Sequence, residues 1–229
     1  MHYFNIFFKM DKEKVKKEVK KEELERFGLG IEVLAVSGKL GTGKNYVVEN
    51  LLEKYLKPKK TIEIAFADHL KVDASITYDV DIKRFLYKKD SESREILQQH
   101  GTENYRKKHG KDIWIRILHK WIQIYISRGY KRIIITDARF ENEIKWILSM
   151  GGKVIKLVSP RRNEARLCEE ANGDESIYEK IKNHSSETEL DNIDDEEYSG
   201  ILKNDYDDED TVEEFFIKLI DDIGLEKKN

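Results

Sequence analysis

Apolar residues occur along this chain in short dense runs separated by longer segments in which they recur every three or four positions. The dense, β-branched runs predict strands over residues 31–36, 61–66, 132–136 and 153–158. The helical spacing of Val47, Val48, Leu51, Leu52 and Tyr55 predicts a helix directly after the first strand, and further helices are expected over 91–101, 112–127, 141–150 and 211–223. Strands that alternate with helices indicate an α/β fold, with a parallel sheet covered by helices on both faces.

Residues that begin or end helices support these boundaries. Ser91 and Asp112 stand where helix N-caps are expected, and Thr211-Val212-Glu213-Glu214 has the form of a capping box. The pair Gly151-Gly152 ends the helix before the fourth strand. The stretch Asp191–Asp210 is strongly acidic and contains few apolar residues, so we predict a loop there.

Composition narrows the class of protein. The 229 residues suit one domain, here expected over 30–229 after a charged N-terminal extension over 1–29 that forms an exposed helix, a solvated arm or a nucleic-acid-binding arm. The 42 Lys and Arg nearly balance 45 Asp and Glu, which argues against a nucleic-acid partner held by charge alone. A single cysteine, Cys168, excludes an internal disulfide and favours the cytoplasm, and no run of 18 apolar residues predicts a membrane span.

A glycine-rich segment joins the first predicted strand to the first predicted helix. Gly38-Lys39-Leu40-Gly41-Thr42-Gly43-Lys44-Asn45 fits the phosphate-binding pattern G-x-x-x-x-G-K, except that Asn45 replaces the usual Ser or Thr. Glycines let several backbone N–H groups point at one anion, and the following helix adds the positive end of its dipole. We therefore expect a nucleotide phosphate here, and a plain glycine turn is the alternative.

Two residues are candidates to hold Mg²⁺ near that loop. The amide oxygen of Asn45 would be a weaker ligand than the usual hydroxyl, so a carboxylate is expected to help. Asp137 comes directly after the buried strand at 132–136, and ligands of open α/β sheets bind at the carboxyl ends of strands. Capping of the next helix is the alternative role for Asp137, and the two roles are compatible.

Several basic residues also follow predicted strands. Lys71 comes after the second strand, Arg139 lies two residues beyond Asp137, and the cluster Arg161, Arg162 and Arg166 follows the strand that ends at Val158. Phosphoryl transfer needs cations that neutralise the charge on the transferred group, and a small-molecule kinase needs a second anion site for its acceptor. These positions therefore favour a kinase, although each arginine taken singly is equally well a surface charge.

Six segments, in the same order, resemble the deoxynucleoside monophosphate kinases of bacteriophages and large DNA viruses. They are Ser37–Asn45, Phe66-Ala67-Asp68-His69-Leu70-Lys71, Leu97-Gln98-Gln99-His100-Gly101-Thr102-Glu103, Asp112-Ile113-Trp114, Thr136-Asp137-Ala138-Arg139-Phe140-Glu141-Asn142-Glu143 and His184-Ser185-Ser186-Glu187-Thr188-Glu189-Leu190-Asp191. The resemblance runs from about residue 31 to residue 191. It implies a P-loop kinase fold with a lid over about 160–190, and a cytoplasmic enzyme, in the host if the source is viral.

The same resemblance implies the activity and the roles of the site residues. ATP and Mg²⁺ would convert a deoxynucleoside monophosphate to its diphosphate by direct in-line transfer, and a homodimer is left open. The donor would be held by Gly38, Lys39, Gly41, Thr42, Gly43, Lys44, Asn45 and Arg161, the acceptor by Lys71, Gln98, Trp114, Arg139 and Glu187, and catalysis would depend on Lys44, Asp137, Arg139, Arg162 and Arg166. Within that acceptor set, Gln98, Trp114 and Glu187 are expected to form the base pocket.

Two other functions remain open from the sequence. A phosphomevalonate kinase of the animal type has a similar loop and a similar Asp-Ala-Arg segment, here Asp137-Ala138-Arg139. A regulatory module that binds nucleotide without transferring phosphate is the second, and Asn45 is the residue that favours it.

Overall fold

The computed structural model describes residues 30–88, 91–205 and 209–228. The chain divides into two units, Met1–Ile31 and Glu32–Asn229, and the description below concerns the second. The predicted N-terminal extension over 1–29 lies outside the described residues.

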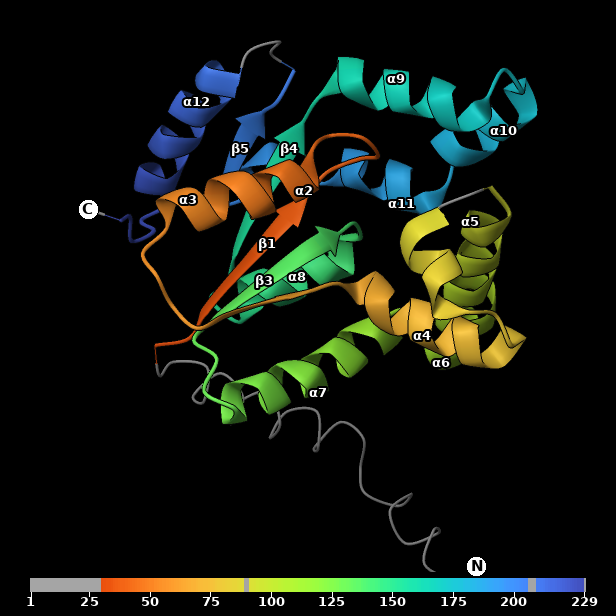
Figure 1. Ribbon diagram of the computed structural model, residues 1–229, viewed down its shortest axis with the longest axis horizontal. Helices are drawn as coiled ribbons and strands as arrows, with labels where there is room; N and C mark the ends of the chain where they lie inside the picture. Colours follow the sequence, from red (N-terminus) through yellow and green to blue (C-terminus); the bar gives the residue numbers. More distant parts are fainter. Residues whose placement is uncertain (1–29, 89–90, 206–208, 229) are drawn as a thin grey trace, which may run out of the picture. The chain divides into compact units, whose positions relative to one another are not determined.

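Five parallel strands form one sheet in the order β2-β3-β1-β4-β5 (Figure 1). Their bounds are β1 Glu32–Ser37, β2 Thr61–Ile64, β3 Arg132–Ala138, β4 Lys153–Val158 and β5 Gly200–Lys203. The predicted parallel α/β sheet is confirmed. Because β1 lies between β3 and β4, the loop that leaves its carboxyl end stands at the middle of that edge, where open parallel sheets bind their ligands.

Helices connect the strands, and several are joined end to end. Continuous helices run over α2 (Lys44–Tyr46), η1 (Val47–Leu52) and α3 (Glu53–Tyr55), and over α5 (Ser91–Gln98), η3 (Gln99–Arg106) and α6 (Lys107–His109), where η1 and η3 are π-helical. The others are α4 (Phe66–Tyr78), π-helical η2 (Arg84–Lys88), α7 (Ile113–Ser127), α8 (Glu141–Ser149), α9 (Pro160–Ala171), α10 (Glu175–Lys182), α11 (Ser185–Thr188), the 3-10 turns η4 (Glu189–Asn192) and η5 (Asp195–Glu197), and α12 (Glu209–Asp222).

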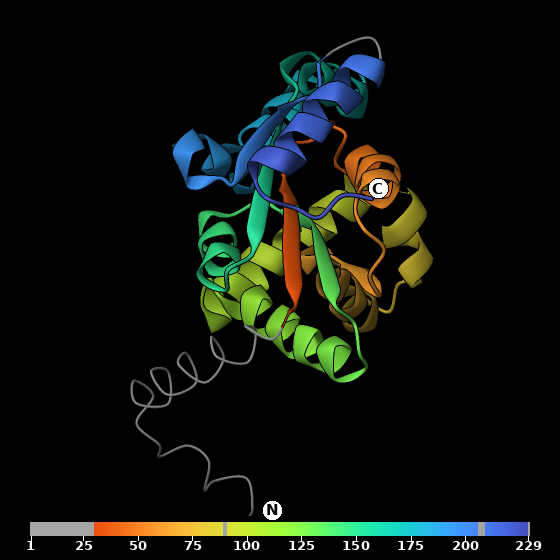
Figure 2. The ribbon, with the colours of Figure 1, turned by 90° about the vertical axis from the view of Figure 1, so that its left-hand side faces the viewer.

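Helices cover both faces of the sheet, as Figure 2 shows for the orange α2–α3 helix and the green α8 on opposite sides. On one face, Leu34 of β1 and Leu202 of β5 belong to a core with Leu51 of η1 and Phe216 of α12. Side chains alternate between the faces of a strand, so burial on both sides accounts for the continuous apolar run in β3.

The segment predicted as an acidic loop, Asp191–Asp210, instead contains the edge strand β5. Acidic residues precede and follow this four-residue strand, Gly200-Ile201-Leu202-Lys203, so its apolar residues are too few to be recognised in the sequence pattern. In the structure Leu202 is buried next to β4. Gly200 leaves room for α12 to pack closely, because a Cβ there would lie 2.2 Å from Cδ1 of Leu219 and would force that side chain to move.

Several other predicted boundaries also differ from the structure: the strand predicted over 132–136 extends to Ala138, and the helix predicted over 91–101 continues to His109. Strand β2 ends at Ile64, because Phe66 already begins α4, a helix that the sequence analysis did not predict. Helix α12 begins at Glu209, before the predicted capping box at Thr211, so that box lies inside the helix. Asp112 does precede α7, but its side chain accepts a hydrogen bond from Asn142 Nδ2 at 2.9 Å and makes no cap bond to its own helix.

Candidate active site

The glycine-rich loop leaves β1 and ends at the start of α2, as the motif requires. Gly41 and Gly43 have φ angles of +75° and +88°, which side-chain-bearing residues rarely adopt. A Cβ on Gly41 would also lie 2.6 Å from Cβ of Arg166, and one on Gly43 would lie 2.2 Å from Nδ2 of Asn204. The backbone angles and the close approach of Arg166 and Asn204 therefore both favour glycine at these two positions.

Lys44 folds back over this loop. Its Nζ donates hydrogen bonds of 2.7 Å to the backbone oxygens of both Gly38 and Lys39. Burial and the positive charge of Arg139 hold the pKa of Lys44 well below its usual range, although Glu187 and Asp137 act in the opposite direction. An anionic phosphate beside the amine would favour its charged form.

Residues far along the chain hold the loop backbone in place. Leu40 donates its N–H to Glu187 Oε2 at 2.7 Å and accepts from Asn163 Nδ2 at 2.7 Å through its carbonyl. The buried Asn204 donates to the carbonyl of Thr42 at 2.9 Å. The loop is thus shaped before any ligand binds, which lowers the entropic cost of binding.

A cavity of about 470 Å³ opens beside the loop, within the usual range for small-molecule sites. The structure brings seven of the predicted residues together on its walls, namely Lys44, Asn45, Lys71, Gln98, Trp114, Asp137 and Arg139. Its walls carry five Lys and Arg side chains against three Asp and Glu, so the cavity suits an anionic ligand.

Two of those cations were missed by the sequence analysis. Arg94 and Arg106 line the cavity on the same continuous helix as Gln98 and Thr102. These four residues are spaced four apart, so they share one helix face. The spacing of Arg94 and Arg106 from Gln98 is therefore the feature of the sequence that could have predicted them as site residues.

Arg106 is held in a fixed position at the cavity wall. Its Nη2 donates to Glu143 Oε1 at 2.6 Å, and its Cζ lies 3.6 Å from the centroid of the Phe140 ring. Glu143 also accepts from the backbone N–H groups of Arg139 and Phe140, at 3.0 and 3.2 Å. Burial raises the pKa of Glu143 to about 7, although Arg106 and the Arg139 amide favour its charged form.

Asp137 lies inside β3 and not directly after it, because the strand extends to Ala138, beyond its predicted end at Thr136. Its Oδ1 and Oδ2 accept from the N–H groups of Phe66 and Ala67, at 2.7 and 2.9 Å. Asp137 thus caps α4, not the following helix α8 that the sequence analysis considered. Burial raises its pKa, against those two bonds and Arg139, which lower it.

The residues present suit Mg²⁺ carried by a nucleotide, because this ion usually takes one or two protein ligands and otherwise water and phosphate oxygens. Asn45 is exposed and lines the same cavity as Asp137. Within residues 30–88, 91–205 and 209–228 no group of three His, Cys, Asp or Glu side chains is arranged to hold a metal by itself.

The predicted lid arginines do not line this cavity. Helix α9, which carries Arg162 and Arg166, packs against the loop at Gly41, where the Arg162 carbonyl would lie 2.9 Å from an added Cβ. Arg166 pairs with Glu169 at 2.6 Å and Glu170 at 2.7 Å. Arg161, in the first turn of the same helix, is exposed, and its backbone N–H donates to Asp205 Oδ2 at 3.1 Å.

The three predicted base-pocket residues occupy different environments. Gln98 is half-buried on the cavity wall. Trp114 is 3% exposed and its ring stacks on Tyr105 at 5.0 Å, so only part of it meets the cavity. Glu187 does not line the cavity and instead contacts Leu40 and Arg139.

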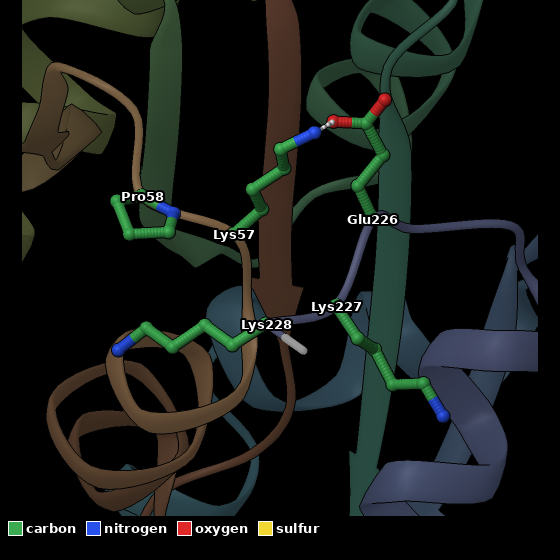
Figure 3. Close-up of a pocket in the computed structure, with 5 residues that line it drawn as sticks. All are labelled: Lys57, Pro58, Glu226, Lys227 and Lys228. Atoms are coloured by element: carbon green, nitrogen blue, oxygen red, sulfur yellow. Dashed lines mark ion pairs between the residues drawn. The ribbon is translucent and has the colours of Figure 1, made fainter.

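A second hollow, of about 510 Å³, has no residue of the loop in its lining and offers no comparable site. Figure 3 shows Lys57 reaching Glu226 across it while Lys227 and Lys228 point apart. Lys227 pairs with Asp221 at 2.6 Å and Lys228 donates to the Glu53 carbonyl at 2.7 Å. These lysines do not converge on one point, so the hollow does not have the arrangement of charges that an anion-binding site needs.

No protein-family model and no curated protein matches the chain. Among solved structures, the chain is similar to a dephospho-CoA kinase from Campylobacter jejuni, with 16% sequence identity, a TM-score of 0.42, and coverage of 83% of this chain and 96% of that one. Among the helices of the described residues, none has both the length and the apolar character needed to cross a membrane.

Proposed function

We propose that this chain is an ATP- and Mg²⁺-dependent phosphotransferase that converts a deoxynucleoside monophosphate to its diphosphate. One observation carries the proposal: a phosphate-binding loop and a set of basic side chains from three other elements face the same cavity. Lys44 and the loop amides would hold the donor phosphates at one end. Lys71, Arg106 and Arg139 would hold the acceptor phosphate.

The chemistry requires no nucleophilic side chain. A phosphate oxygen of the acceptor is largely ionised near neutral pH and can attack the terminal phosphorus of ATP in line. The chain would act by positioning the two substrates and by neutralising the charge on the transferred group with Lys44 and Arg139. Asn45 and Asp137 would hold Mg²⁺ beside the donor phosphates, where the ion would supply further positive charge.

The aromatic residues of the cavity favour a nucleotide as the acceptor. Phe85, Trp114 and Phe140 line it together with the polar Gln98 and Thr102. Aromatic rings stack on a base, and amide or hydroxyl groups can bond its edge.

The test is a coupled assay of ADP formation with ATP, Mg²⁺ and each of dTMP, dGMP, dCMP, dAMP and dUMP, with phosphomevalonate as a sixth acceptor. Turnover of one or more deoxynucleotides is expected. Product from phosphomevalonate alone would replace the proposal with the other kinase function. ATP binding with no ADP formed from any acceptor would indicate a non-catalytic nucleotide-binding module.

Lys44→Ala provides the control for the loop. Because Lys44 would neutralise charge that grows in the transition state, we expect kcat to fall by roughly 100-fold or more. A near-normal kcat in this variant would show that Lys44 does not stabilise the transition state.

A further inference from the structure

Glu187 is a buried carboxylate with its two oxygens committed to different parts of the site. It belongs to the short helix α11 and is 5% exposed. Its Oε2 accepts the backbone N–H of Leu40 at 2.7 Å, and its Oε1 forms an ion pair with Nη1 of Arg139. Leu40 belongs to the phosphate-binding loop, whereas Arg139 follows β3 on the acceptor side.

This carboxylate stands behind the cavity wall. Leu40 and Arg139 both line the cavity, but Glu187 does not. A guanidinium has five N–H donors, and the Glu187 bond uses one nitrogen, so the others can bind a ligand. Glu187 can therefore keep both of its partners while the cavity is filled.

Burying a carboxylate is costly unless charged or N–H partners compensate. Breaking either bond leaves charge that water cannot reach, so the two bonds of Glu187 depend on each other. The positions of the Leu40 amide and of the Arg139 guanidinium are consequently linked through a single group.

We propose that Glu187 is a positioning residue that couples the donor and acceptor sites, so that each substrate binds more tightly when the other is bound. This inference depends on the proposed function. An acceptor phosphate that fixes Arg139 also fixes Glu187 and, through it, the amide of Leu40 in the donor loop. The entropic cost of ordering these groups is then met by the first ligand, and the second binds with a smaller loss.

The experiment measures this coupling by isothermal titration calorimetry. The acceptor is the deoxynucleoside monophosphate with the highest turnover in the panel, titrated with and without saturating Mg²⁺ and a non-hydrolysable ATP analogue. For the unmodified protein we expect the analogue to lower the acceptor Kd at least ~5-fold, the lower end of typical allosteric coupling. Glu187→Gln should reduce this factor to about 1. Leu40 and Arg139 use different oxygens of Glu187, and the amide replaces one of these oxygens with an NH2 group that cannot accept a hydrogen bond.

Asp191→Asn is the matched control. Asp191 lies four residues away, and it pairs with Lys39 of the same loop at 2.7 Å. Its side chain is 58% exposed, and Lys39, with which it pairs, lies on the donor side. This variant should keep the full coupling factor, whereas a loss equal to that of Glu187→Gln would assign the effect to general loosening of the loop.

Hydrogen exchange in the unmodified protein gives a second test that needs no variant. Acceptor alone should slow exchange of the Leu40 amide several-fold, although it binds on the other side of Glu187. An unchanged Leu40 amide, or a coupling factor of 1 in the unmodified protein, would overturn the inference while turnover upheld the function. Absence of turnover with every acceptor would instead overturn the proposed function.

Discussion

Asp137→Asn separates two roles for the carboxylate at the end of β3, a ligand for Mg²⁺ and a cap for α4. Both oxygens accept backbone N–H groups, from Phe66 at 2.7 Å and Ala67 at 2.9 Å. Helix α4 has no cap bond from its own N-cap residue, Ala65, so Asp137 supplies the cap from another element. An amide in its place has one acceptor oxygen and presents an N–H group to the second backbone donor.

The expected loss of stability follows from these contacts. A hydrogen bond to a charged group contributes about 1.5–3 kcal/mol, and a negative charge at a helix N-terminus adds about 0.3–1 kcal/mol. Removing the buried charge offsets part of this loss, because burial disfavours the ionised form. We therefore expect the free energy of unfolding to fall by roughly 2 kcal/mol, which lowers the urea midpoint by about 1 M.

Urea unfolding followed by circular dichroism in a buffer with EDTA is the deciding assay, because it contains no free Mg²⁺. Asp68→Asn is the control: Asp68 lies in the first turn of the same helix, and its side chain is 52% exposed. We expect that variant to change stability by about 0.5 kcal/mol or less. Equal midpoints for Asp137→Asn and the unmodified protein in EDTA would refute the capping role and leave the metal role.

Three further outcomes test other parts of the site. Arg139→Ala should raise KM for the monophosphate roughly 10- to 100-fold, as expected for a lost charged hydrogen bond, and an unchanged acceptor KM in steady-state assays would give Arg139 another role. Glu143 has its pKa raised to about 7, so its contribution to stability is present below about pH 4.5 and is lost as the pH rises through 7. Between pH 5 and pH 8 the unmodified protein should lose roughly 2 kcal/mol relative to Glu143→Gln in urea unfolding, and parallel pH profiles would contradict this pKa. Asn204→Ala should lower the free energy of unfolding by about 1–3 kcal/mol, because the buried Thr42 carbonyl loses its donor, and should raise the Kd for ATP in calorimetry; an unaltered Kd would show that the loop keeps its shape without this contact.

Much of the sheet could be predicted from the sequence because its strands are dense in β-branched residues. The run Ile133-Ile134-Ile135 is apolar on both faces, and the structure buries it in β3, between β2 and β1. Strand β5 has no such signal: it is four residues long, lies at an edge and is surrounded by acids. Its formation depends on pairing with β4, a long-range contact that a local pattern does not contain.

The site was partly predictable for a similar reason. The loop is encoded locally, since Gly41 and Gly43 need backbone angles that favour glycine. The partners of Glu187 and Asp137 are not encoded locally, because they come from elements 147 and about 70 positions away. The sequence marked both acids as functional, and only the fold reveals that each one bonds backbone N–H groups.

The bonds that hold the phosphate-binding loop also have a consequence for synthesis. The loop is complete in sequence by residue 45, but Asn163, Glu187 and Asn204, which fix Leu40 and Thr42, follow 123 to 162 positions later. A nascent chain on the ribosome therefore exposes the loop long before the residues that hydrogen-bond it have been synthesised. The loop should consequently become able to bind a triphosphate only late in translation, after β5 has paired with β4 at the edge of the sheet.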